Sequence, residues 1–94
     1  MELGTLDLTT DDADHYTFGR LPGAVTFVLD NPTVSRVHAV AQFRESDGAL
    51  LLQDLGSTHG TFVNKERLAP RPEWTELRVG DVVQFGQVRG WLAD

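Results

Sequence analysis

Short apolar runs, each five to seven residues long, recur along the chain between turn-forming residues. The run VHAVAQF, residues 37–43, alternates between two faces, with Val37, Ala39, Ala41 and Phe43 on one and His38, Val40 and Gln42 on the other. A period of two is typical of a strand that buries one face. The following SDG, residues 46–48, suits a tight hairpin turn into the apolar run 49–55. We therefore predict that these two strands pair antiparallel.

Further short strands are predicted on both sides of this hairpin. They are 24–29, 60–64, 82–86 and 88–92, the last two forming a second hairpin after a turn at 78–81. The proline-containing stretch 68–74 is expected to be irregular, and Asp11, Asp12 and Asp14 are expected to form a turn between two early strands. No helical spacing of apolar residues persists for three turns. Many short strands in so short a chain predict an all-β fold, either a two-sheet β-sandwich or a small barrel.

The length of 94 residues indicates a single domain, 1–94, with a modest core. No apolar run approaches the roughly 18 residues of a membrane span, so we expect no membrane association. The chain has no cysteine, which excludes disulfides and thiolate metal ligands. Its first residues lack the basic and apolar regions of a signal peptide, which favours an intracellular location, nuclear or cytoplasmic.

The charge balance narrows the class of partner. Fourteen acidic side chains against eight basic ones give a net charge of −6. A nucleic-acid backbone is bound by surplus Lys and Arg, so direct nucleic-acid binding is not expected. An anion bound by this chain must instead meet a local cluster of donors.

Three polar clusters could supply such donors: FGR (18–20), VSRVH (34–38) and GSTHGT (56–61). Taken singly, each has an ordinary explanation, such as a solvated arginine, a turn hydroxyl or a buried histidine bonded to a backbone carbonyl. Taken together, Arg20, Ser35, Arg36 and Thr58 offer guanidinium and hydroxyl donors. A phosphate monoester, with three acceptor oxygens and up to two charges, requires donors of these kinds from several loops.

Catalysis and metal binding fit the same residues less well. Ser35 and His38 are three positions apart, as in a small serine hydrolase, but no G-x-S-x-G motif, orienting acid or oxyanion hole can be placed. His15, His38 and His59 are scattered, with no carboxylate at a ligand-like spacing. We therefore expect no enzyme activity, no catalytic residues, no metal and no cofactor.

Four motifs in order and in spacing resemble the forkhead-associated (FHA) domain. They are FGR, SRVH with its Ser fifteen residues after the Arg, DLGSTHGTFVN and LRVGDVVQFG, and they extend from about Phe18 to the end of the chain. The resemblance implies a two-sheet β-sandwich of about eleven strands, whose loops at one end bind phosphothreonine peptides without catalysis. GRLPG, PTVSRVHAV and DLGSTHGTFVNK look most like the kanadaptin-like branch, and the family resemblance slightly favours the nucleus.

The resemblance also implies a role for each motif residue. Arg20 would be the phosphate-binding arginine, Ser35 a donor to the phosphate, and Arg36 a second cation. Thr58 would touch the phosphate and the wall of the pocket for the threonine methyl group. Structural support would come from Gly19, His38, Gly56, Ser57, Gly60 and Asn64. Within the loop 56–60, Ser57, Thr58 and His59 are expected to face outward, with Ser57 holding the backbone of the loop.

His59 is a departure from the family pattern, which usually has Asn at this position. That Asn hydrogen-bonds the peptide main chain, and a histidine can also donate, although it can gain a proton near neutral pH. The third residue after the phosphothreonine would be recognised by Asn31, Thr33 and Val34 and by residues 87–89 of a later loop, with an apolar or unselective preference. Val25 stands where the family commonly has an acidic residue.

The leading hypothesis is therefore a module that binds a phosphothreonine-containing protein or peptide. The rival is an FHA domain that docks a partner through a sheet face without phosphate. Retention of Arg20, Ser35 and Thr58 favours the first hypothesis, since a domain that no longer binds phosphate has no chemical need for all three.

Overall fold

The computed structural model describes residues 2–6 and 15–92, with side chains from 15 to 90. The predicted acidic turn at Asp11, Asp12 and Asp14 lies outside the described residues. In the part described there are ten strands: β1 (Glu2–Leu6), β2 (His15–Gly19), β3 (Phe27–Val28), β4 (Ala39–Phe43), β5 (Leu50–Asp54), β6 (Thr61–Val63), β7 (Glu66–Arg67), β8 (Thr75–Leu77), β9 (Val82–Phe85) and β10 (Val88–Leu92). Within the same residues no helix is long and apolar enough to cross a membrane.

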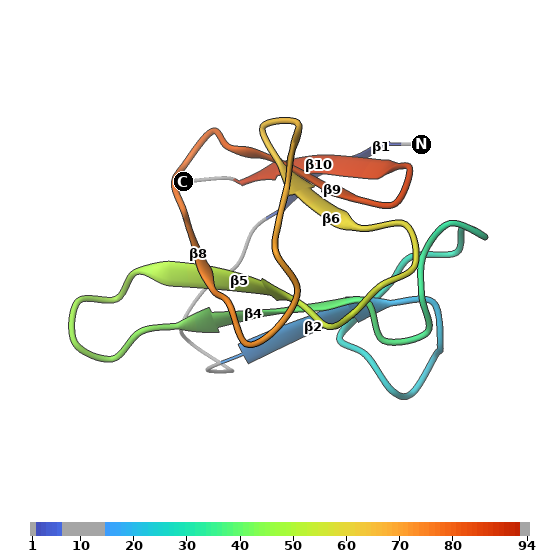
Figure 1. The fold of residues 1–94 in the computed structure, drawn as a ribbon, viewed down its shortest axis with the longest axis horizontal. Helices are drawn as coiled ribbons and strands as arrows, with labels where there is room; N and C mark the ends of the chain where they lie inside the picture. Colours follow the sequence, from blue (N-terminus) through green and yellow to red (C-terminus); the bar gives the residue numbers. More distant parts are fainter. Residues whose placement is uncertain (1, 7–14, 93–94) are drawn as a thin grey trace.

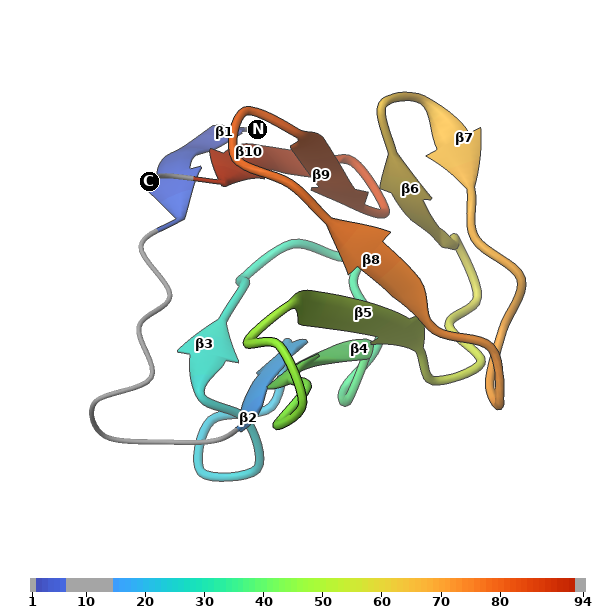
Figure 2. The same ribbon diagram turned by 90° about the vertical axis from the view of Figure 1, so that its left-hand side faces the viewer.

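The strands form two five-stranded sheets that face each other (Figures 1 and 2). One sheet has the order β1-β10-β9-β6-β7, and the other has the order β3-β2-β4-β5-β8. Most neighbours are antiparallel, whereas β1 pairs with β10, and β2 with β3, in parallel. The two-layer arrangement confirms the predicted all-β sandwich.

Both predicted hairpins are present. β4 and β5 pair antiparallel from Ala39 opposite Asp54 to Phe43 opposite Leu50, and β9 and β10 pair through Phe85 and Val88. In the β4–β5 turn, the carboxylate of Asp47 accepts hydrogen bonds from the Arg44 side chain at 2.9 and 2.6 Å. The turn before β9 is closed by the Asp81 N–H, which donates to the Arg78 carbonyl at 3.0 Å.

The predicted alternation holds within β4 but is wrong at the two residues before it. Ala39 and Ala41 are fully buried, as expected, and Gln42 is exposed. Val37, however, is 40% exposed and His38 is fully buried, the reverse of the pattern. The physical reason is that the strand begins only at Ala39, so the preceding backbone is not pleated and is free to turn the His38 ring inward.

One predicted strand is shorter than expected, and other strands were not predicted. The predicted strand 24–29 is reduced to β3, and β7 and β8 were not predicted. Glu66 and Arg67, which make up β7, are both exposed and give no alternation, and β8 is only three residues long. The stretch 68–74 is irregular as expected, apart from one bridge between Asp54 and Pro70.

Aromatic rings fill the core at the end of the sandwich where the polar motifs lie. Phe18 stacks on Phe85 with ring centroids 4.6 Å apart and on Phe27 at 5.1 Å, so it joins the two sheets. The His38 ring meets Phe85 edge-on at 5.8 Å. Figure 1 shows the loops after β2, before β4 and before β6 gathered at this same end, on the right of the view. The packed aromatic rings therefore form a firm base for these loops.

Candidate functional site

An open groove with a volume of about 340 Å³ lies among these loops. The residues that line it are Arg20, Pro32, Thr33, Val34, Ser35, Arg36, Thr58 and His59. The groove thus brings together all five residues that the sequence assigns to phosphopeptide binding, from three separate segments of the chain.

The position of Arg20 depends on the glycine before it. The Arg20 N–H donates to the Ser35 and Arg36 carbonyls at 3.0 and 3.1 Å, so the end of β2 lies directly against the loop before β4. A Cβ atom added to Gly19 would lie 2.2 Å from the Arg36 carbonyl oxygen. Because real Cβ atoms do not approach a backbone oxygen this closely, only glycine permits the contact. Gly19 thereby places Arg20 beside Ser35 and Arg36.

A second connection joins the Ser35 loop to the Thr58 loop. The Thr58 N–H donates to Ser35 Oγ at 3.2 Å. Since Ser35 Oγ accepts this hydrogen bond, its own hydroxyl proton remains available to donate to a ligand. Thr58 and His59 are both exposed, and their side chains line the groove.

The buried ring of His38 connects the Ser35 loop and the Thr58 loop through two hydrogen bonds. The Ser35 N–H donates to His38 Nδ1 at 3.0 Å, so Nδ1 is unprotonated and Nε2 carries the proton that it donates to the Gly60 carbonyl at 2.8 Å. Burial lowers the pKa of His38 below its ordinary value, although the Gly60 hydrogen bond and the charge of Asp54 oppose this shift. Both ring nitrogens are therefore occupied by main-chain groups, which leaves neither available to take a proton from Ser35 Oγ. This geometry speaks against the serine hydrolase alternative.

Asp54, at the end of β5, organises the loop that carries Thr58 and His59. Asp54 is 4% exposed, and its carboxylate accepts hydrogen bonds from the Gly56 and Ser57 N–H groups at 3.1 and 3.2 Å. It also accepts hydrogen bonds from the hydroxyls of Ser57 at 2.5 Å and Thr61 at 2.7 Å. Burial alone would raise the pKa of Asp54, but these hydrogen bonds outweigh it and lower the pKa. The loop is thus closed around a buried carboxylate.

The sequence did not identify Asp54 as part of the site. A signal was present, because an Asp at a strand end followed by Gly and Ser is typical of a side chain that caps its own turn. The expectation that Ser57 faces outward is also wrong, since Ser57 is 8% exposed. Its hydroxyl donates to Asp54 and accepts from the Gly60 N–H at 3.0 Å, and these two hydrogen bonds draw it inside. Ser57 therefore holds the loop and leaves Thr58 and His59 at the surface.

Gly56 and Gly60 occupy backbone conformations that favour glycine, with φ of +79° and +88°. They bracket the segment Ser57 to His59, so the chain can turn sharply on both sides of it. Asn64, by contrast, lies away from the groove, beyond the opposite end of β6. Its side chain bonds Asp81 Oδ1 at 3.1 Å and the Val82 N–H at 3.0 Å, which stabilises the β6–β7 turn rather than the groove loops.

The residues expected to recognise the third residue after the phosphothreonine are partly unavailable. Val34 is 1% exposed, so its side chain belongs to the core. Thr33 Oγ1 donates to Asn31 Oδ1 at 2.6 Å and accepts from the Gln87 N–H at 2.9 Å. Thr33 thereby fastens the groove to the β9–β10 turn, and it still lines the groove wall.

Among the described residues, no carboxylate forms an ion pair with the two arginines at the groove. Arg44 and Arg78 pair with carboxylates elsewhere on the surface. Arg20 and Arg36 are exposed, and neither pairs with a carboxylate in the described part of the chain. Residues 15–92 also contain no group of three His, Cys, Asp or Glu side chains that could hold a metal. The groove is accordingly a cationic, hydroxyl-lined depression in a protein of net negative charge.

Comparison with known proteins points to one family. A family model described as the FHA domain matches residues 16–86. Human kanadaptin is 46% identical in an alignment 93 positions long that covers 89% of this chain and 12% of kanadaptin. Human nuclear inhibitor of protein phosphatase 1 is 38% identical over 80 residues, which cover 84% of this chain and 22% of that protein. The chain therefore spans less than a quarter of the length of either relative.

A solved structure shares the fold and part of the sequence. The N-terminal FHA domain of Saccharomyces cerevisiae Rad53p, determined in complex with a phosphothreonine peptide, has a TM-score of 0.68 and 34% sequence identity. The match covers 77% of this chain and 56% of that chain.

Proposed function

Since this chain belongs to the FHA domain family, we propose that it is a binding module whose groove holds a phosphothreonine of another protein. The observation that carries the proposal is the convergence of Arg20, Ser35, Arg36 and Thr58 on one groove. Residues 1–94 would form one such domain, and its role would be phosphorylation-dependent protein–protein interaction. No catalytic step, metal, cofactor, nucleic acid or membrane enters the proposal.

The groove offers the positive charge and the hydrogen-bond donors that a phosphate dianion requires. Two arginines supply charge and forked N–H donors, and the Ser35 hydroxyl has a proton to donate because its oxygen already accepts from Thr58 N–H. The Thr58 hydroxyl adds a further donor at the rim. Arg20 and Arg36 have no carboxylate partner among the described residues, so the phosphate does not have to displace an existing ion pair.

The loop geometry supports recognition beyond the phosphate. The Thr58 side chain lines the groove next to Ser35, where it can contact the γ-methyl group of a phosphothreonine. Burial of one methyl group is worth about 1 kcal/mol, which corresponds to a preference of roughly fivefold over phosphoserine. His59 would donate to the peptide main chain beside the phosphothreonine.

Two relatives support the proposal. The Rad53p FHA domain was solved with a phosphothreonine peptide, and this chain shares its fold and about a third of its sequence over the matched region. The second relative is named a nuclear inhibitor of protein phosphatase 1, which favours a nuclear place of action within the nucleus-or-cytoplasm alternative.

The proposal is tested by titrating a degenerate phosphothreonine peptide library against the wild-type chain and Arg20→Ala. Charge-assisted hydrogen bonds contribute about 1.5–3 kcal/mol each, so Arg20→Ala should weaken binding by roughly tenfold to a hundredfold. The matched control is Arg71→Ala, which removes an exposed arginine outside the groove and should leave affinity unchanged. Because Arg20 is exposed, its removal should leave the melting temperature within about 3 °C of the wild-type value.

The same titration separates the two binding hypotheses. Equal binding of phosphorylated and unphosphorylated peptides, or equal weak binding by wild type and Arg20→Ala, would contradict phosphate recognition. A partner that is captured without phosphate and is still captured by Arg20→Ala would favour docking through a sheet face.

A further inference from the structure

Arg67 lies against the binding loop although it comes from a strand that the sequence did not predict. A Cβ atom added to Gly60 would lie 2.8 Å from Arg67 Nε and 3.1 Å from Arg67 Cζ. The guanidinium therefore covers the main chain at Gly60, the residue directly after His59. Consecutive Cα atoms are about 3.8 Å apart, so Thr58 and His59 are within about 8 Å of Gly60.

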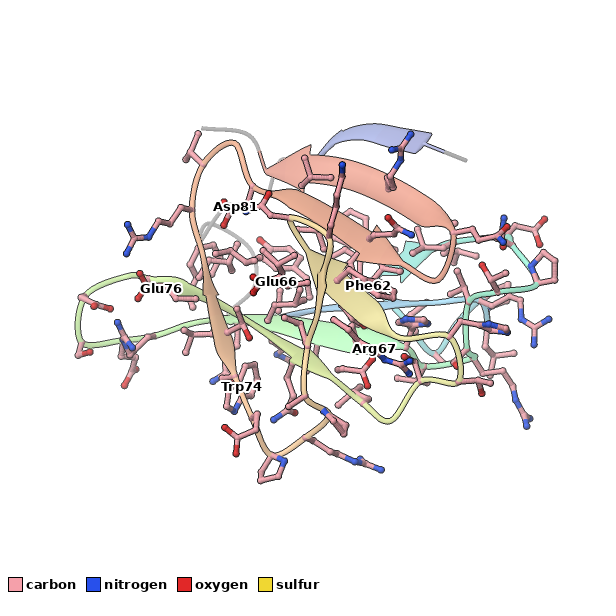
Figure 3. The ribbon with its side chains drawn as sticks, turned by 45° about the horizontal axis from the view of Figure 1, so that its top comes forward. Phe62, Glu66, Arg67, Trp74, Glu76 and Asp81 are labelled. Carbon is pink, nitrogen blue, oxygen red and sulfur yellow. The ribbon has the colours of Figure 1, made fainter. Side chains whose placement is uncertain are left out.

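The sheet geometry explains how Arg67 reaches this position. Phe62 and Arg67 are opposite each other in the β6–β7 pair and so project from the same face (Figure 3). Gly60 lies two residues before Phe62, and Arg67 extends along this face past the start of β6 to cover it. The N–H of Gly60 is bonded to Ser57 Oγ and its carbonyl to His38 Nε2, so the surface under the guanidinium is fixed.

Arg67 is also available to a ligand. It is exposed, and within residues 15–92 it pairs with no carboxylate, in contrast to Arg44 and Arg78. Arg67 is not one of the residues that line the groove, and it lies on the other side of β6 from the turn to which Thr33 is attached. In the sheet, β6 has β9 on one side and β7 on the other. The Thr33 hydroxyl is attached to the turn after β9, whereas Arg67 is on β7.

We propose that Arg67 is a specificity-determining residue that binds an acidic group on the bound peptide, the carboxylate of a Glu or Asp side chain, a few positions from the phosphothreonine. The acidic group belongs to the peptide flank that passes over His59 and Gly60, away from Thr33 and Gln87. An extended peptide advances about 3.3 Å per residue, so a side chain two or three positions from the phosphothreonine reaches this distance. This inference rests on the proposed function of the groove.

The experiment uses a phosphothreonine peptide with alanine at three positions on each side, and six versions with a single Glu replacing one of these alanines. Dissociation constants are measured for the wild type, Arg67→Gln, Arg67→Glu and Arg78→Ala. Arg67→Gln keeps much of the aliphatic stem that covers Gly60 and removes the charge. Arg78 is an exposed arginine on the turn before β9 and serves as the matched control.

We expect Glu on one flank to tighten wild-type binding by about twofold to fivefold, as for an exposed ion pair. The preference should vanish in Arg67→Gln, become a penalty in Arg67→Glu, and persist in Arg78→Ala, while the all-alanine peptide binds wild type and Arg67→Gln alike. Binding of the phosphopeptides with no Glu preference, or a preference that survives in Arg67→Gln, would overturn this inference alone. Failure of every phosphopeptide to bind the wild type would overturn the proposed function and this inference together.

Discussion

Arg20 and Arg36 reach the groove from two different loops, and Gly19 brings them together. The close approach of Gly19 to the Arg36 carbonyl leaves no room for a side chain, so the second arginine is positioned by a residue that does not itself line the groove. Ser35 accepts a hydrogen bond from Thr58 N–H and thereby becomes a directed donor. At the scale of single residues, binding chemistry thus depends on hydrogen bonds that the protein has already formed.

His59 gives the first prediction at this scale. It is exposed and lines the groove, where its ring can donate a hydrogen bond to the main chain of a bound peptide, as the amide of asparagine can. His59→Ala removes this donor and should weaken binding of a phosphothreonine peptide by about twofold to tenfold, whereas His59→Asn keeps a donor and should bind like the wild type. Dissociation constants of the three proteins for one phosphothreonine peptide provide the check. Equal affinity of His59→Ala and wild type would remove His59 from the recognition mechanism.

At the scale of elements, the site is built where strands end. β2 ends at Gly19, β4 begins one residue after His38, and β5 ends at Asp54. Each of these strand ends directs a polar group into the loops, while the paired strands behind it are fixed by the sheet. Asp54 contributes most to the order of the loop after β5, because its carboxylate accepts four hydrogen bonds from the segment 56–61.

The loop network predicts a stability effect for Asp54→Asn. The amide retains the shape of the carboxylate but replaces one acceptor oxygen by a donor. Either the N–H groups of Gly56 and Ser57 or the buried hydroxyls of Ser57 and Thr61 then lose their acceptor. The free energy of unfolding should fall by about 2 kcal/mol, and the melting temperature by roughly 10 °C. Asp30→Asn, which changes an exposed carboxylate, should have an effect below about 0.5 kcal/mol. Urea unfolding of the three proteins measures the free energies of unfolding, and thermal unfolding measures the melting temperatures. Equal stability of Asp54→Asn and wild type would show that the network is not needed.

The elements also show what the sequence could and could not predict. The hairpins at 37–55 and 82–92 follow from alternation and turn residues, because one face of each strand is buried. β7 consists of two exposed residues and is stabilised by pairing with β6, so no pattern in its own residues predicts it. His38 and Ser57 are buried by hydrogen bonds to residues distant in space or around a tight turn, which hydrophobic periodicity cannot register. The position of Arg67 could not be predicted either, because β7 itself was not predicted.

At the scale of the whole molecule, two sheets joined by Phe18 and Phe85 hold three loops at one end (Figure 1). Net charge is −6, yet Arg20, Arg36 and Arg67 lie at or beside the groove without a carboxylate partner among the described residues. Attraction of an anionic peptide therefore depends on the loop rim and should weaken with added salt.

Stability of the whole fold should depend on pH through His38 and Asp54. Burial lowers the pKa of His38, so the unfolded chain binds more protons than the folded one just below pH 6.5, and stability falls as the pH is lowered through that range. The hydrogen bonds to Asp54 lower its pKa in spite of burial, so a second loss follows as the pH falls below about 4. Urea unfolding between about pH 7.5 and 3 measures both. His38→Gln should lack the first loss, and a wild-type stability that is constant between about pH 7 and 5 would contradict the assignment to His38.

The central claim is that the groove at the loop end binds phosphothreonine, and an NMR titration tests it most directly. The labelled chain is titrated with a phosphothreonine peptide and, separately, with the same peptide lacking the phosphate. The predicted result is that the phosphopeptide shifts the backbone amide signals of Arg20, Ser35, Arg36, Thr58 and His59 most strongly, and that the unphosphorylated peptide leaves them in place. Shifts confined to the outer sheet faces, or the same shifts with both peptides, would contradict the claim.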